Sequence, residues 1–144
     1  MKSRVVLDID APPKRVAKLY ADPTYNTSWM YELRRCEPVS GKPGMPGSVY
    51  RLIPKDGSML FTATVVSRLP NELRLRLDAE NVSVDVHGTL SMLPDGRTRF
   101  ASEEVFHFKG VWNKAYGVLA RPAIRKTHKK HIKAFKRFAE RHSS

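Results

Sequence analysis

Five strand-like segments follow one another through the middle of the chain, and this run constrains the fold more than any other feature. They cover residues 48–53, 59–67, 73–79, 82–92 and 97–108. In the third and fourth segments apolar and polar residues alternate, which is typical of a strand with one covered and one solvated face. Turn sequences such as Pro94-Asp95-Gly96 separate the segments, and connections this short join antiparallel neighbours. The sequence therefore predicts an antiparallel meander.

The flanks of the meander predict two further strands and several helices. Residues 3–9 alternate like a strand, and Asp10-Ala11-Pro12-Pro13 predicts a helix start with an acidic cap. A second short helix is expected over residues 25–31, followed by a weak strand over residues 33–39.

The chain changes period after the meander. Beyond Gly110 the apolar residues recur every three or four positions, which predicts one long C-terminal helix. Pro122 should kink this helix about a turn earlier, near Val118. Because no other element is long enough to cover the sheet, we expect an α+β fold with this helix across the apolar face.

Size and composition place the chain among ordinary globular proteins. Its 144 residues suit one domain, residues 1–144, and 41% of them are apolar. The apolar stretches fall far short of the roughly 18 residues that a membrane span needs. We see no secretory signal, and the single cysteine, Cys36, allows no internal disulfide. These features predict a cytoplasmic protein.

A series of short motifs, in a fixed order along the chain, carries a family resemblance. The motifs are Ile9-Asp10-Ala11-Pro12-Pro13, Ala21-Asp22-Pro23 with Trp29, Gly47-Ser48-Val49-Tyr50, Leu69-Pro70-Asn71-Glu72-Leu73, Pro94-Asp95-Gly96-Arg97 and Phe135-Lys136-Arg137-Phe138-Ala139-Glu140. Together they resemble the START-like, Bet v 1-like (SRPBCC) superfamily, nearest its polyketide cyclase/dehydrase and lipid-transport branch.

The resemblance implies a helix-grip fold, in which a curved antiparallel sheet wraps a long C-terminal helix and two short helices follow the first strand. It also implies a cavity between sheet and helix. The superfamily has no shared catalytic motif and includes carriers, cyclases and steroid or quinone binders, so the resemblance assigns no catalytic residue.

Alternation along the strands predicts which side chains face the helix, and this set is the predicted ligand site. Apolar walls with a few polar points describe a small-molecule site, but they also describe a filled core. The residues are Trp29, Tyr50, Phe61, Leu75, Val84, Val86, Leu90, Phe100, Ser102, Glu104, Phe106, Tyr116 and Leu119.

Glu104 is the most informative member of this set. It shares a strand face with three phenylalanines, and a carboxylate there needs a partner or a proton. One interpretation is a polar anchor or general acid/base inside the cavity, with Ser102 as a second polar contact. The alternatives are a bulge that turns the side chain outward, or a structural pair with Arg51 or Arg76.

The histidines give weaker indications. His128 and His131 lie one helical turn apart, a permissible spacing for metal ligands, but the helix supplies no third ligand. We therefore expect His128 to touch the edge of the core, and we expect neither a metal nor another cofactor.

Positive charge is concentrated at the C-terminal end. Residues 121–142 carry a net charge of +8 out of +12 for the whole chain. The predicted anionic-surface residues are Lys126, Lys129, Lys130, Lys133 and Lys136. They form either a solvated outer helix face or a dock for an anionic membrane or an acidic protein. No signature of sequence-specific nucleic-acid binding is present.

Three functions follow from these observations. The favoured one is binding or carrying a hydrophobic small molecule such as a lipid, an isoprenoid or an aromatic polyketide. The second is a cyclase or dehydratase with Glu104 as acid/base and Tyr50 or Ser102 positioning the substrate. The third is an interaction module that acts through the basic helix.

Overall fold

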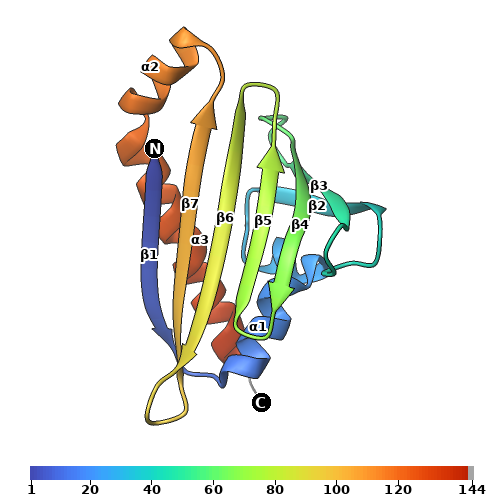
Figure 1. Ribbon diagram of the computed structural model, residues 1–144, viewed down its shortest axis with the longest axis vertical. Helices are drawn as coiled ribbons and strands as arrows, with labels where there is room; N and C mark the ends of the chain where they lie inside the picture. The colour runs from blue at the N-terminus through green and yellow to red at the C-terminus, as the bar shows by residue number, and fades with distance from the viewer. Residues whose placement is uncertain (143–144) are drawn as a thin grey trace.

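A curved, antiparallel sheet forms the body of the protein (Figure 1). The computed structural model describes residues 1–142, with the side chains of residues 111–114 excepted. Within that range the sheet has seven strands in the order β1-β7-β6-β5-β4-β3-β2. The strands are β1 (Lys2–Ile9), β2 (Leu33–Ser40), β3 (Val49–Pro54), β4 (Phe61–Leu69), β5 (Glu72–Asp78), β6 (Val82–Met92) and β7 (Thr98–Phe108). The expected meander is confirmed, because β2 to β7 pair consecutively.

Two short helices connect β1 to β2. They are α1 (Pro13–Ala21) and the 3-10 helix η1 (Pro23–Ser28), so the second helix starts two residues earlier than expected. The predicted acidic cap on α1 is wrong. Its N-cap is Pro12, without a side-chain hydrogen bond, and the backbone N–H of Asp10 donates instead to Glu140 Oε2 at 2.8 Å.

The C-terminal segment forms two helices rather than the single kinked helix that was expected. They are α2 (Val111–Leu119) and α3 (Arg121–Arg141). Pro122 lies in the first turn of α3, where a missing backbone N–H costs nothing, and the chain breaks at Ala120. Pro122 therefore starts a new helix instead of kinking a continuous one. The break at Ala120 lies two residues later than the kink expected near Val118.

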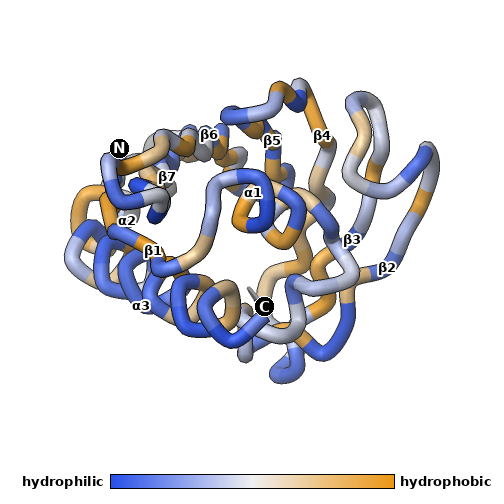
Figure 2. Tube along the Cα trace, turned by 90° about the horizontal axis from the view of Figure 1, so that it is seen from below, coloured by the Kyte–Doolittle hydropathy of each residue, from blue (hydrophilic) through white to orange (hydrophobic). Residues whose placement is uncertain are grey.

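Helix α3 runs behind the sheet along β1, with α2 beyond its N-terminal end (Figure 1). The view from below shows the sheet curving round α3 and α1, and the outer side of α3 is hydrophilic (Figure 2). The buried side of α3 carries His128, Ile132, Ala134, Phe135, Phe138 and Ala139. The helix therefore closes the concave face of the sheet, as predicted.

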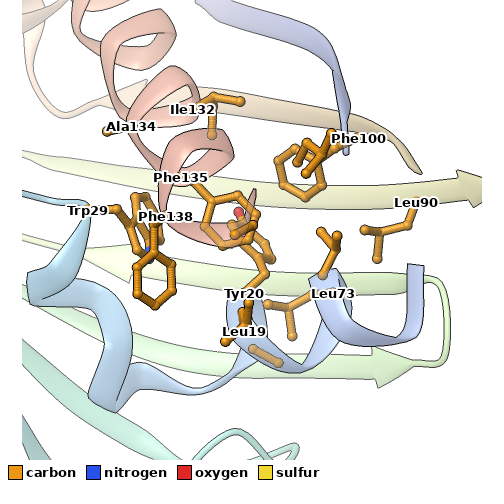
Figure 3. Packing of buried hydrophobic residues seen from close by; sticks show 14 of the residues in the cluster. Leu19, Tyr20, Trp29, Leu73, Leu90, Phe100, Ile132, Ala134, Phe135 and Phe138 are labelled. Carbon is orange, nitrogen blue, oxygen red and sulfur yellow. The ribbon is translucent and has the colours of Figure 1, made fainter. Parts of the chain in front are cut away.

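A cluster of buried aromatic rings packs near α1 (Figure 3). The ring of Tyr20 contacts the rings of Phe100 and Phe135 edge to face, with centroids 4.8 and 5.1 Å away. Gly88 on β6 permits this approach, since a Cβ atom there would lie 2.8 Å from Tyr20 Cε2. A separate buried cluster of Val82, Val84 and Val86 lies toward the α2 end. One end of the space under the sheet is thus filled by aromatic rings.

Candidate functional site

A cavity of about 410 Å³ lies between the sheet and the N-terminal half of α3. Its walls are mostly apolar, with Met30, Leu33, Leu52, Pro54, Met59, Phe61, Leu77, Val84, Phe106, Tyr116, Ala120, Ala123 and Ile124 among the lining residues. The polar lining residues are Glu32, Ser58, Glu104, Thr127, His128 and His131. The sequence was compatible with either a cavity or a filled core between the sheet and the helix. The structure has a cavity there.

A second, smaller hollow of about 60 Å³ adjoins the first toward α1. The two share Met30, Leu52, Leu77, Glu104 and His131 as lining residues. The smaller hollow adds a set of polar side chains that the larger one lacks: Tyr20, Asn26, Tyr50 and Ser102. An apolar outer space thus leads to a polar inner one, with Glu104 at the junction.

Glu104 faces inward from β7, as the alternation indicates. It stands opposite Ser3 on β1 and Val86 on β6 in regular register, so no bulge turns it outward. Its Oε1 atom lies 3.6 Å from Nδ1 of His128. Burial raises the pKa of Glu104 to about 7, with His131 acting in the opposite direction.

The basic partners considered for Glu104 bind elsewhere. Arg51 pairs with Glu37, and Arg76 pairs with Asp78 and Asp85 on the outer face of the sheet. The alternatives of an outward bulge and of these two arginine pairs are therefore wrong.

His128 lies deeper than the edge of the core where it was expected. It is 1% exposed and joins three elements, because Nδ1 is 2.8 Å from Ser3 Oγ and Nε2 is 2.9 Å from Ser102 Oγ. Burial, together with a smaller effect of nearby His131, lowers the pKa of His128 to about 4. A neutral imidazole donates from one nitrogen and accepts at the other, and two serine hydroxyls can satisfy both.

His131, one turn further along α3, ties the helix to the segment before β2. Its Nε2 atom is 2.6 Å from Glu32 Oε1, and both residues line the larger cavity. Burial alone would raise the pKa of Glu32, but the hydrogen bond and charge of His131 hold that pKa below its usual value. This pair closes one side of the cavity.

Trp29 follows η1 and lines the smaller hollow. Its side chain is buried, and its Nε1–H has no hydrogen-bond partner among the described residues. Buried donors are rarely left unpaired, because desolvation of such a group costs about 1–3 kcal/mol.

The structure brings most of the predicted site residues together. Phe61, Val84, Glu104, Phe106 and Tyr116 line the larger cavity. Trp29, Tyr50, Leu75, Val86 and Ser102 line the smaller hollow. Their contact with a ligand stays a prediction.

Three predicted residues lie outside both hollows. Leu90 and Phe100 are packed in the aromatic core near α1. Leu119 was expected to face inward, but its side chain is 82% exposed. The helix break at Ala120 changes the direction in which this residue points, so the single-helix prediction placed it wrongly.

Sequence reasoning missed several lining residues. Met30, Glu32, Pro54 and Met59 come from connecting segments, where no periodicity indicates the direction of a side chain. His128 did carry a signal, since it is a polar residue in the apolar stripe between Ile124 and Ile132.

The basic side of α3 is largely as predicted, with one correction. Lys126, Lys129, Lys130 and Lys133 are exposed. Lys136 instead points back to the fold, and its Nζ atom donates to the backbone oxygen of Asp8 at 2.6 Å and to Glu140 Oε2 at 3.0 Å. It is therefore removed from the exposed basic set.

The described part of the chain shows neither a metal-binding cluster nor a membrane-spanning helix. Residues 1–142, apart from the undescribed side chains, contain no cluster of three or more His, Cys, Asp or Glu residues suited to a metal ion. In the same residues no helix combines the length and the apolar character that crossing a membrane requires.

Comparisons with known proteins agree with this geometry. Residues 1–140 match the family described as polyketide cyclase / dehydrase and lipid transport. No curated protein matches the chain.

Solved structures share the fold at low sequence identity. The ZhuI aromatase/cyclase from Streptomyces sp. R1128 is 14% identical, with a TM-score of 0.78 over 98% of this chain and 94% of that one. Ara h 8.0201 is 16% identical, with a TM-score of 0.70 over 96% and 97%. The di-domain ARO/CYC BexL from the BE-7585A biosynthetic pathway is 19% identical, with a TM-score of 0.76 over 100% of this chain and 50% of that one. These likenesses confirm the helix-grip fold.

Proposed function

The chain belongs to the polyketide cyclase / dehydrase and lipid transport family, and from this premise we propose that it binds and carries a hydrophobic small molecule. The ligand class is a lipid, an isoprenoid or an aromatic polyketide. The single observation that carries the proposal is the cavity of about 410 Å³ with mostly apolar walls. Its size falls within the range of roughly 300–1,000 Å³ that is typical of ligand pockets.

The polar groups of the cavity favour a carrier over an enzyme. Proton transfer during catalysis needs an oriented acid/base and a group that stabilises developing charge. Glu104 can supply the first, but both ring nitrogens of His128 are already bonded to serines. Among the described residues, no lysine or arginine lines either hollow.

Filling the cavity tests the proposal. Ala123 lines it and Ala115 on α2 does not, although both alanines are exposed. We expect the wild type to bind a neutral naphthylamine dye, and hydrophobic molecules to appear in organic extracts of the purified protein. Ala123→Phe should weaken dye binding about tenfold or more, and the matched variant Ala115→Phe should leave it unchanged. An unchanged affinity of Ala123→Phe for the dye would contradict the proposed site.

A cyclase or dehydratase is the second candidate, and one observation favours it. Burial raises the pKa of Glu104 to about 7, so this carboxyl group can give and take a proton near neutral pH. Tyr50 and Ser102, in the adjoining hollow, would position the substrate. An aromatic polyketone precursor would then lose water in the presence of the protein, as seen by mass spectrometry. Glu104→Gln should abolish this loss while keeping dye binding.

Docking on an anionic membrane is a further candidate, and it would serve ligand delivery. Two apolar side chains that line the cavity are also exposed, with Met59 46% and Tyr116 65% exposed, and Leu119, next to the lining residue Ala120, is 82% exposed. The exposed lysines of α3 follow Tyr116 and Leu119 in the sequence. Each cation near an anionic membrane surface contributes about 1 kcal/mol to the binding free energy.

Matched charge removal tests the docking. The double variant Lys126→Gln/Lys129→Gln should weaken binding to vesicles containing phosphatidylglycerol about tenfold or more. Lys14→Gln/Lys18→Gln, which removes the same charge from exposed positions on α1, should have a much smaller effect. Equal binding to neutral and anionic vesicles would contradict membrane docking. Binding to an acidic protein without binding to vesicles would also contradict it and would indicate that the partner is a protein.

A further inference from the structure

We propose that Glu104 anchors a hydroxyl group, and that the ligands of the cavity are therefore uncharged hydrophobic alcohols or phenols. The inference rests on the proposed function and names the ligand class that the cavity selects. The apolar body of such a molecule would lie in the larger cavity, with its hydroxyl end at the junction with the smaller hollow.

The carboxyl group of Glu104 has hydrogen-bonding capacity that the protein leaves unused. Its Oε1 atom is 3.6 Å from Nδ1 of His128, which is beyond hydrogen-bond distance. That nitrogen is already bonded to Ser3 Oγ at 2.8 Å. Within the described part of the chain, no other group is hydrogen-bonded to this carboxyl group. A ligand can therefore bind it without displacing an existing partner.

Both carboxyl oxygens of Glu104 are accessible. Among the described residues, Trp29 Nε1 is the only buried side-chain nitrogen or oxygen atom that lacks a hydrogen-bond partner. The Glu104 oxygens also lack a partner, so neither of them is sealed inside the protein. The side chain is 20% exposed and lines both hollows from the inward face of β7. A ligand in the hollows can thus reach the carboxyl group.

A hydroxyl group suits a carboxyl group that exists in two forms near neutral pH. Burial raises the pKa of Glu104 to about 7, so its protonated and ionised forms are both populated there. A hydroxyl accepts a hydrogen bond from the protonated form and donates one to the ionised form, whereas a ketone can only accept. An alcohol or a phenol is therefore bound in either state.

Charged ligand groups fit this site less well. A ligand carboxylate would lie beside Glu104, and no lysine or arginine among the described lining residues would compensate its charge. An ammonium group would need the ionised form of Glu104, and it would lose its hydration between mostly apolar walls. The net charge of +12 on the chain also disfavours the approach of cations.

Glu32 is the other carboxylate among the described residues that line the larger cavity, and it already has a partner. Its Oε1 atom is 2.6 Å from Nε2 of His131, and its side chain is 48% exposed. A ligand hydroxyl at this position would compete with the histidine and with solvent water. Glu104 is therefore the better anchor.

Matched naphthalenes test the inference by displacement of the naphthylamine dye. The key pair is 2-naphthalenemethanol and 2-ethylnaphthalene, in which a hydroxyl replaces a methyl group. The ratio of the affinity for the alcohol to that for the hydrocarbon should fall about fivefold or more in Glu104→Leu, the effect of one hydrogen bond. Using this ratio removes the difference in hydrophobicity between the two compounds.

Glu103→Leu is the matched control. Glu103 precedes the anchor on β7, lies on the opposite face of the strand and pairs with Lys2. Its replacement should leave the ratio of affinities unchanged. In the wild type, 2-naphthylmethylamine and 2-naphthoate should both bind more weakly than the alcohol.

A measurement on the unmodified protein covers the case in which Glu104→Leu does not fold. With ¹³C in the glutamate side-chain carboxyl groups, the Glu104 signal should differ between the complexes with the alcohol and with the hydrocarbon. The ring-current effect of the naphthalene is common to both complexes, so the difference reports the hydroxyl group. The signal is assigned by its absence from Glu104→Gln.

The outcomes separate this inference from the proposed function. An unchanged ratio in Glu104→Leu, or a Glu104 signal that is the same in both complexes, overturns the inference and leaves the carrier function standing. Tighter binding of the amine or the naphthoate than of the alcohol does the same, as does a ratio that falls in Glu32→Leu alone. Binding of neither the dye nor any naphthalene overturns both.

Discussion

The Glu104 carboxyl group lies 3.6 Å from the Nδ1 atom of His128, across the seam between β7 and α3. Burial acts on the two groups in opposite directions, raising the pKa of Glu104 to about 7 and lowering that of His128 to about 4. Each shift favours the uncharged form. Between about pH 4 and 7 the two residues therefore form a neutral pair rather than an ion pair.

This neutral pair predicts how Glu104→Gln changes stability with pH. The folded protein holds the Glu104 proton more tightly than the unfolded chain, whose pKa is about 4.5. The stabilisation is present below pH 4.5 and is lost as pH rises through 7. The free energy of unfolding of the wild type, relative to Glu104→Gln, should fall by up to about 3 kcal/mol between pH 4.5 and 8. Urea titrations at several pH values measure it. A wild type that gains stability with pH would show instead that His128 holds Glu104 ionised.

Removing the Ser102 hydroxyl should destabilise the protein through His128. Ser102→Ala leaves Nε2 of the buried imidazole without its 2.9 Å partner, at a cost of about 1–3 kcal/mol in the free energy of unfolding. Ser91 on the neighbouring strand is exposed, so Ser91→Ala is the matched control and should cost much less. Equal effects of the two changes in chemical denaturation would argue against a structural role for the Ser102–His128 bond.

A methyl group at Gly88 should disturb the aromatic core. Gly88→Ala places a Cβ atom 2.8 Å from Tyr20 Cε2, and overpacking of this kind costs about 1–3 kcal/mol. The cost should fall sharply in a Tyr20→Leu background, because the clashing ring edge is then absent. A double-mutant cycle of unfolding free energies measures the coupling. Strict additivity would mean that β6 and α1 adjust without contact between these residues.

Lys136 and Lys133 should respond differently to loss of charge. Lys136→Met removes the hydrogen bond to the Asp8 backbone oxygen that joins α3 to β1, and we expect a loss of about 1 kcal/mol. Lys133 is exposed, so Lys133→Met should be close to neutral. Thermal and urea denaturation of the pair would settle this. If Lys133→Met is the more damaging, our division of the basic residues is incorrect.

Periodicity predicted most of the fold because strands and helices impose it on the chain. The strand Val82–Met92 has the bounds expected from its alternation, and the inward direction of Glu104 follows from the same pattern. The break at Ala120 could not be seen in this way, because Pro122 is compatible with a kink or with a new helix start.

The site was predicted less completely, since it depends on how elements pack. That His128 meets Ser3 and Ser102 is decided by the depth at which α3 lies against β1 and β7. The unpaired N–H of Trp29 depends on every neighbour of one ring, and no local pattern in the sequence contains that information.

The position of β2 at the rim of the sheet bears on how the protein behaves at high concentration. An unpaired strand is a template on which a second copy can add its own strand, the first step toward aggregation. Here Pro38 removes one N–H from β2, and the register with β3 shifts at Leu33/Arg35 and again at Pro38/Ser40. The opposite rim, β1, is packed against α3. A sheet whose concave face encloses a cavity is thus protected along its edges against growth into a longer one.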